Sequence, residues 1–138
     1  VPIDAGIIVS TPQNISLIDA KKALDMMERL SIPVLGMIEN MSYLEQNGEK
    51  IALFPKGDLD RFLEGKSLKK LASLPFYPQL GQSGETGIPL CETHKQHPSL
   101  VHFTELAQKV KNHLFWDTCA GMNHATGIAD TPAIVYWT

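Results

Sequence analysis

Two short apolar runs with an amphipathic stretch between them open the chain. Residues Ala5 to Ser10 (AGIIVS) and Val34 to Ile38 (VLGMI) are continuous apolar runs, the pattern of strands that are covered on both faces. Between them, apolar residues recur at helical spacing, with most of the charged residues opposite. This apolar face consists of Leu17, Ala20, Leu24, Met26, Met27 and Leu30. Strand, helix and strand with short connections predict a right-handed βαβ unit, and therefore a parallel sheet.

Local signals predict the ends of this first helix. Ser16 with Asp19 three residues later resembles a capping box, so we expect the helix to begin near Ser16. Ser31-Ile32-Pro33 should end it, because the residue before a proline disfavours helical dihedrals.

The middle of the chain has a looser pattern. Tyr43-Leu44 and Lys50 to Phe54 predict a small β-hairpin across Gln46-Asn47-Gly48, since Asn-Gly is a strong turn signal. Leu59 to Leu71 predicts a helix that is broken near Gly65, and Leu71 to Pro75 predicts a third, short strand.

The last third of the chain combines a loop, a helix and a tail. Prolines and glycines predict a long loop over residues 76–98. Pro98-Ser99 then opens the clearest helix, whose apolar face consists of Leu100, Phe103, Leu106, Ala107, Val110 and Leu114. We therefore expect one α/β unit over residues 1–114 and a tail of unknown structure over residues 115–138. Within the tail, Ala133 to Trp137 is expected to add to the sheet as a strand.

Composition narrows the class of protein. A chain of 138 residues with 43% hydrophobic and 20% charged residues is one modest globular domain. Its formal net charge of −3 gives no general attraction to nucleic acid or to an anionic membrane. The apolar runs are too short to span a bilayer, and the start lacks a signal-type run, so we expect a cytoplasmic protein.

Because the chain begins with Val1 and enters a strand almost at once, we interpret it as a fragment. The two cysteines make no disulfide framework and are expected to be small buried residues.

Five ordered segments together resemble a known family. They are Ser10-Thr11-Pro12-Gln13, Val34 to Ser42 (VLGMIENMS), Leu74 to Pro78 (LPFYP), Gly87 to Leu90 (GIPL) and Phe103 to Ala107 (FTELA). This set is similar to the C-terminal half of the Mrp-type P-loop ATPases, the iron–sulfur cluster carrier proteins, which are relatives of the cell-division ATPase MinD. The resemblance implies a partial P-loop NTPase fold of Rossmann-like type, with a parallel sheet flanked by helices. A generic βαβ protein with a chance Glu-Asn-Met-Ser segment is the alternative.

The resemblance also implies an adenine site. In this family the asparagine that ends the second strand faces the adenine, which here is Asn40. The loop Pro75-Phe76-Tyr77 resembles the segment that wraps the other side of the base through backbone groups. Physical chemistry agrees, because an amide places a donor beside an acceptor, and open α/β sheets bind ligands at the carboxyl ends of their strands. The alternative is that Asn40 only caps a turn.

The residues that would handle phosphate are expected upstream of Val1. The family uses a Gly-rich loop with lysine and an aspartate for magnesium. Asp60 to Ser67 (DRFLEGKS) ends like such a loop, but it has Asp60 where the first glycine belongs and follows no buried strand, so we reject it. ATP and Mg²⁺ are thus implied for the full-length protein, which the resemblance makes a homodimer, whereas this chain alone is expected to be inactive.

Candidate metal ligands are few. Many family members have Cys-x-x-Cys shortly after the Asn-Met-Ser block, where two subunits share an iron–sulfur cluster, but residues 43–48 contain no cysteine. Cluster carriage by this route is therefore doubtful. Cys91, His94 and His97, with His102 nearby, could bind zinc, although exposed loop histidines are the favoured interpretation. The spacing Gly81, Gly84, Gly87 lacks a Gly-x-Gly start and is interpreted as a flexible loop.

Two functions therefore stand side by side. The first is part of an ATP-binding iron–sulfur cluster carrier that retains the adenine side of its site and serves iron–sulfur client proteins. The alternative is a non-catalytic interaction module that docks on a complete P-loop ATPase through its sheet edge or its first helix. A phosphate-binding loop encoded just upstream of Val1 would favour the first.

Overall fold

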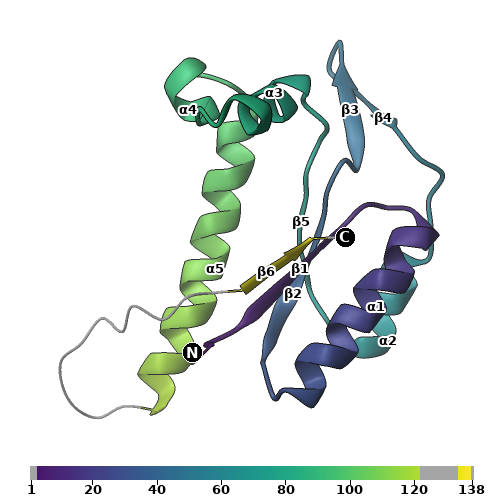
Figure 1. Ribbon diagram of the computed structural model, residues 1–138, viewed down its shortest axis with the longest axis vertical. Helices are drawn as coiled ribbons and strands as arrows, with labels where there is room; N and C mark the ends of the chain where they lie inside the picture. The colour runs from purple at the N-terminus through teal and green to yellow at the C-terminus, as the bar shows by residue number, and fades with distance from the viewer. Residues whose placement is uncertain (1–2, 122–133, 138) are drawn as a thin grey trace.

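A four-stranded parallel sheet forms the centre of the molecule (Figure 1). The computed structural model describes residues 3–121 and 134–137, with side chains described as far as residue 114. The strand order is β5 (Lys70–Ser73), β2 (Val34–Glu39), β1 (Gly6–Ser10) and β6 (Ile134–Trp137). All three pairings are parallel, which confirms the predicted α/β class with a parallel sheet.

Helices cover both faces of this sheet (Figure 1). On one face, α1 (Asn14–Arg29) and α2 (Leu59–Lys66) enclose a core with the inward side chains of the strands. That core consists of Ile8, Leu17, Ala20, Ala23, Leu24, Met27, Met37, Leu59 and Leu63. On the other face, α5 (Ser99–Gly121) packs against a second apolar cluster, made of Ile7, Val9, Ile38, Leu71 and Leu74. The alternating inward and outward residues of β1 therefore supply both cores.

The predicted hairpin is present. Strands β3 (Tyr43–Gln46) and β4 (Glu49–Ala52) pair antiparallel, with Tyr43 opposite Ala52. Asn47 and Gly48 both have positive φ, 53° and 80°, as a two-residue turn matched to the strand twist requires. The second strand ends at Ala52, earlier than the expected Phe54.

The beginning of α1 differs from its prediction. The helix begins at Asn14, its N-cap is Gln13, and no side chain caps it. Ser16 instead shares a 2.6 Å hydrogen bond between its Oγ and Oγ1 of Thr11. The predicted capping box is therefore wrong, because the Ser16 hydroxyl is occupied by the loop that precedes the helix. The helix end agrees with prediction, with Ser31 in the left-handed region at φ 56°.

Two short helices lie where a long loop was predicted. Helix α3 (Pro78–Thr86) and helix α4 (Leu90–Thr93) fall inside residues 76–98, so the loop prediction is wrong there. Pro78 opens α3, where its missing N–H costs nothing, and Gly87 closes it at φ 69°. Gly81 and Gly84 lie within α3 and form no flexible loop. No residue of α3 is buried, which explains why the sequence shows no apolar periodicity there.

Other boundaries shift by a few residues. Helix α2 runs without a break through Gly65 and ends at Lys66, followed by Ser67 at φ 53°. Strand β5 ends at Ser73 instead of Pro75. Helix α5 continues past Leu114 to Gly121, so the expected domain boundary at 114/115 falls inside a helix.

The tail contributes a strand to the sheet. Ile134–Trp137 pairs in parallel with β1, from Gly6 opposite Ile134 to Val9 opposite Trp137. The predicted strand is confirmed for these four residues, whereas Ala133 lies outside the described residues. In the described part of the chain, no helix is long and apolar enough to cross a membrane.

Candidate functional site

The carboxyl ends of three strands meet at one edge of the sheet. The backbone N–H of Asn40, directly after β2, donates a 2.8 Å hydrogen bond to the carbonyl of Ser10 at the end of β1. The N–H of Leu74, directly after β5, donates at 2.8 Å to the carbonyl of Glu39. The loops that follow β1, β2 and β5 are thereby fixed side by side at the edge where such sheets bind ligands.

Asn40 presents an uncommitted amide at this edge. Asn40 is half-buried, and its backbone N–H is fixed by the hydrogen bond to the Ser10 carbonyl. Among the described residues, its side chain has no hydrogen-bond partner, so the amide does not cap the turn that follows. Met41 turns the chain sharply at φ 51°. The donor and acceptor of the Asn40 side chain are therefore available to a ligand.

The loop Pro75-Phe76-Tyr77 lies against the segment that follows Asn40. Ser42 donates its N–H to the carbonyl of Leu74 at 2.9 Å, and Phe76 donates its N–H to the carbonyl of Tyr43 at 2.8 Å. Two regions more than 30 residues apart in sequence therefore run side by side. The structure places Asn40 and this loop at the same edge of the sheet.

The two aromatic residues of this loop differ. Phe76 is 38% exposed. The Tyr77 ring packs edge-on against the His97 ring, with 4.8 Å between centroids, and its hydroxyl donates a long 3.5 Å bond to Oε2 of Glu45. Burial, together with the negative charge of Glu45, raises the pKa of Tyr77. The Tyr77 side chain is therefore engaged with His97 and Glu45, whereas the Phe76 side chain is exposed.

Glu39 organises the polar side of the site, and the sequence analysis missed it. Its Oε2 accepts hydrogen bonds from Oγ of Ser42 at 2.7 Å and from Oγ of Ser73 at 3.0 Å. Lys70 Nζ lies 3.4 Å from the same oxygen, and the Glu39 side chain is only 13% exposed. One carboxylate thus ties the end of β5 to the loop that carries Asn40. A glutamate directly before the strand-ending asparagine is the sequence signal that could have indicated it.

Lys70 joins Glu39 to helix α2. It forms a second ion pair with Asp60, which also pairs with Lys56 at 3.2 Å. Burial lowers the pKa of Lys70, but the hydrogen bond and charge of Asp60 and the charge of Glu39 outweigh it, so that the pKa is raised. The hydrogen bond from Lys70 keeps the pKa of Asp60 below its usual value. Lys70 and Asp60 therefore each favour the charged form of the other.

Gly57 lets the segment before α2 approach the start of α1. A Cβ at this position would lie 2.5 Å from the carbonyl oxygen of Pro12 and 2.6 Å from Oδ1 of Asn14. The same Oδ1 accepts a 2.8 Å hydrogen bond from the N–H of Asp58. The loop between β1 and α1 is thus held closely from outside by a glycine-dependent contact.

The rejected phosphate loop is helical in the structure. Residues 60–66 belong to α2, and Lys66 pairs with Glu28 of α1 at 3.4 Å. A continuous helix exposes no row of backbone N–H groups to a phosphate, so this segment cannot act as a phosphate cradle.

The cysteine and histidines form no metal site in the described part of the chain. No group of three or more His, Cys, Asp or Glu residues is placed there to hold a metal ion. Cys91 is exposed, so the expectation of a small buried cysteine is wrong for this residue. His97 instead caps α5, because its Nδ1 accepts the N–H of Ser99 at 3.2 Å and lies 2.8 Å from the Ser99 hydroxyl.

A parallel sheet covered on both faces, with convergent loops at its carboxyl edge, defines an α/β nucleotide-binding class of fold. Comparison with known proteins identifies the family. Residues 1–111 match the family model described as NUBPL iron-transfer P-loop NTPase. The chain therefore belongs to this family.

Individual relatives agree with this assignment. An iron–sulfur cluster carrier protein from Haemophilus influenzae is 35% identical over 118 residues, covering 84% of this chain and 32% of the relative. Those from Pyrococcus horikoshii and Helicobacter pylori are 34% and 38% identical, covering 39% and 30% of their lengths. A nucleotide-binding protein from Archaeoglobus fulgidus, solved in complex with ADP, is 31% identical with a TM-score of 0.50, covering 60% of this chain and 35% of that one. The chain spans about a third of the length of these relatives.

Proposed function

We propose that this chain supplies the adenine side of the nucleotide site of an ATP-binding iron–sulfur cluster carrier. One observation carries the proposal, namely the uncommitted Asn40 amide beside the Pro75-Phe76-Tyr77 loop at the carboxyl edge of the sheet. An amide matches the paired donor and acceptor on the edge of a purine. The relative from Archaeoglobus fulgidus was solved with ADP, which supports a nucleotide as the ligand.

The remaining parts of the activity belong to a longer protein. Two thirds of the length of the relatives has no counterpart in this chain, and we propose that their phosphate and magnesium groups reside there. In such a complete, cytoplasmic protein we expect a homodimer that binds Mg-ATP and passes iron–sulfur clusters to client proteins. The hairpin β3–β4 follows Asn40 here and contains no thiol, so a cluster held there by cysteines does not fit this chain.

The purified chain is expected to show no ATP hydrolysis above a blank. Most of the catalysis of phosphoryl transfer is electrostatic stabilisation by groups around the phosphates, and the one segment resembling a phosphate loop is helix α2. A phosphate-release assay with Mg-ATP measures this. Turnover that disappears in Lys66→Ala would contradict the expectation.

Substitution of Asn40 tests the proposed site. The experiment titrates adenosine into the isotope-labelled chain and follows the Asn40 side-chain amide by nuclear magnetic resonance. We expect its signals to move with adenosine and not with cytidine. Asn40→Ala should weaken adenosine binding by about 1–3 kcal/mol, the cost of leaving polar base atoms unpaired.

Asn112→Ala is the matched control, because Asn112 is exposed on α5 and bonds only within that helix. Its affinity for adenosine should equal that of the wild type. Equal affinity in the wild type and Asn40→Ala would remove Asn40 from the site.

A further inference from the structure

The chain turns sharply directly after β2, at the residue that follows Asn40. Met41 has φ 51°, in the left-handed region that residues other than glycine seldom adopt. The backbone is tied down on both sides of it. The N–H of Asn40 is bonded to the carbonyl of Ser10 at 2.8 Å, and the N–H of Ser42 is bonded to the carbonyl of Leu74 at 2.9 Å. The direction of the Asn40 amide therefore depends on how firmly this turn is held.

One oxygen of Glu39 contacts both segments of the proposed adenine site. Its Oε2 accepts a hydrogen bond from the hydroxyl of Ser42 at 2.7 Å and another from the hydroxyl of Ser73 at 3.0 Å. Ser42 lies two residues after Asn40, and Ser73 lies two residues before Pro75. The same atom therefore fixes the turn that carries Asn40 relative to the loop that begins at Pro75.

The Glu39 side chain is itself held in place. It is only 13% exposed, and Nζ of Lys70 lies 3.4 Å from Oε2. Lys70 in turn pairs with Asp60 of α2. A carboxylate beside an ammonium group accepts stronger hydrogen bonds than a neutral oxygen does. A glutamine at this position would keep an acceptor oxygen but would lose the attraction to Lys70.

We propose that Glu39 is a positioning residue of the adenine site, which fixes the Asn40 amide relative to the Pro75-Phe76-Tyr77 loop. Groups that bind a ligand must be held within about 0.5 Å of their productive positions by hydrogen bonds from supporting residues. Glu39 acts through the two segments that it joins and makes no contact with the base. The proposal rests on the proposed function, because it concerns the same site.

A positioning role predicts how two substitutions combine. Glu39→Gln should weaken adenosine binding by about fivefold or more, within the usual range of coupling between sites. If this loss arises through Asn40, it should become much smaller once the Asn40 amide is removed, because effects on one shared interaction are not additive. The double variant Glu39→Gln/Asn40→Ala should therefore bind adenosine nearly as tightly as Asn40→Ala alone.

The experiment titrates adenosine into the isotope-labelled full chain and follows it by nuclear magnetic resonance. It compares the wild type, Glu39→Gln, Asn40→Ala and the double variant, each shown to be folded by circular dichroism. Without adenosine, the side-chain amide signals of Asn40 should already move in Glu39→Gln, whereas those of Asn112 on α5 should not. Ser42→Ala removes a single donor to Glu39 and should weaken binding in the same way, with a smaller loss.

One control separates positioning from a general loss of stability. Val34→Ala shortens a half-buried side chain at the amino end of β2, which packs against the core beneath α1. It should lower stability, but its affinity for adenosine should equal that of the wild type, because it lies at the opposite end of the strand from Glu39.

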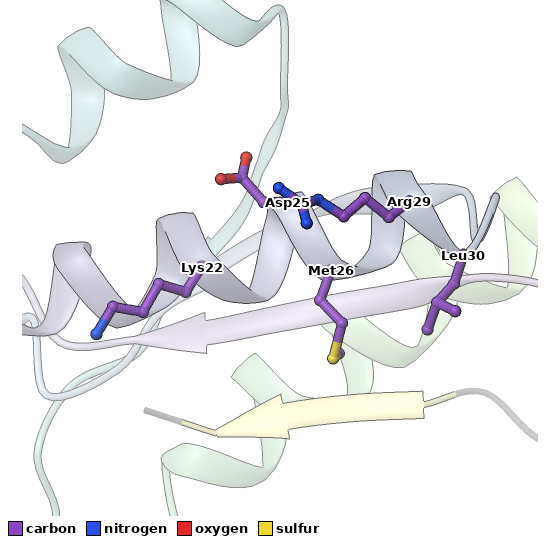
Figure 2. A pocket seen from close by; sticks show the side chains of 5 residues that line it. All are labelled: Lys22, Asp25, Met26, Arg29 and Leu30. Carbon is purple, nitrogen blue, oxygen red and sulfur yellow. The ribbon is translucent and has the colours of Figure 1, made fainter.

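A second control covers another place where a nucleoside could bind. A hollow of about 430 Å³ lies on α1 (Figure 2). It is lined by Lys22, Asp25, Met26, Arg29 and Leu30. Asp25→Asn makes the same change from carboxylate to amide at this exposed position and should leave the affinity for adenosine unchanged.

The outcomes distinguish this proposal from the proposed function. If Asn40→Ala weakens adenosine binding but Glu39→Gln does not, the positioning role is wrong and the adenine site stands. Equal losses from Glu39→Gln with and without the Asn40 amide would also overturn the positioning role, as would an equal loss in Val34→Ala. A wild-type chain that does not bind adenosine would overturn the proposed function and, with it, the role of Glu39.

Discussion

At the scale of single residues, one oxygen atom of Glu39 has three partners. Ser42 and Ser73 donate to it, and Lys70 lies near it. Two of these partners are 31 and 34 residues away in sequence. The resemblance to the family implied Asn40 and the loop over residues 75–77 as site residues, because those residues form recognisable segments. It could not predict Glu39 as their organiser, because that role arises from long-range contacts.

Replacement of this carboxylate should destabilise the protein. Glu39→Ala is expected to lower the free energy of unfolding by about 1–3 kcal/mol, since its donors and the Lys70 charge lose their acceptor. Glu39→Gln keeps an acceptor oxygen and should cost less. Urea denaturation of both variants measures the difference, with the exposed Glu92→Ala as control. Equal losses in the two Glu39 variants would show that hydrogen bonding by this oxygen contributes little.

Asp60 should make stability depend on pH in acid. Its hydrogen bond from Lys70 is the largest influence, and together with Lys56 it outweighs burial and keeps the pKa of Asp60 below 3.8. A carboxyl whose pKa is lowered in the folded state stabilises the protein above its unfolded pKa, and this contribution is lost as pH falls through the folded pKa.

Unfolding by urea at successive pH values below about 4 should therefore show a smaller loss of stability in Asp60→Asn than in the wild type. Asp58→Asn at the neighbouring position makes the same change of charge without a Lys70 partner. The difference should be small, because the Asp60 side chain is 41% exposed. Parallel pH profiles in the wild type and Asp60→Asn would contradict this account.

At the scale of elements, β2 depends on a glycine at its closest approach to β5. Gly36 has φ 153°, and a Cβ there would collide with the carbonyl oxygen of Lys69 and lie 3.0 Å from Leu71. Gly65, inside α2, has open space around it. The two glycines therefore differ in what an added methyl group would meet.

Alanine substitution should act in opposite directions at these sites. Gly36→Ala is expected to destabilise the protein by about 1–3 kcal/mol, from backbone strain and collision. Gly65→Ala should stabilise it by about 0.5–1 kcal/mol, because alanine is the better helix former. Thermal unfolding of both variants gives the two signs. A stable Gly36→Ala variant would mean that β2 and β5 can move apart.

Some helices and strands could be predicted from the sequence and others could not. Strands β1 and β2 were predictable because burial on both faces leaves a continuous apolar run. Helix α1 was predictable because its buried face leaves apolar residues at helical spacing. Helix α3 buries no residue and left no such pattern. The start of α1 was misplaced because Ser16 bonds to Thr11 of the preceding loop, which local helix rules do not consider.

At the scale of the whole molecule, strand β6 pairs with the edge of the buried strand β1 that would otherwise be unpaired. All five residues of β1 are buried, and β6 pairs along its outer edge. The family model ends at residue 111, so this strand lies beyond the part of the chain that matches the family.

Removal of residues 134–138 should therefore increase self-association. The edge of β1 would then present unpaired N–H and C=O groups, which readily pair with another chain. Light scattering of the shortened and full chains at equal concentration measures the effect. Identical scattering from the two chains would show that β6 does not protect this edge.

The parallel pairing of β6 with β1 also determines at which edge of the sheet a tag or linker at either end of the described chain would emerge. Gly6 and Ile134 begin at the amino edge of the sheet, whereas Val9 and Trp137 lie toward the carboxyl edge, and Figure 1 shows the two termini at different places on the molecule. An affinity tag or a surface linker joined after Trp137 would thus emerge on the side where Asn40 lies. A linker attached ahead of β1 would leave that side facing solution, which makes it the better anchor for biosensor measurements with nucleosides.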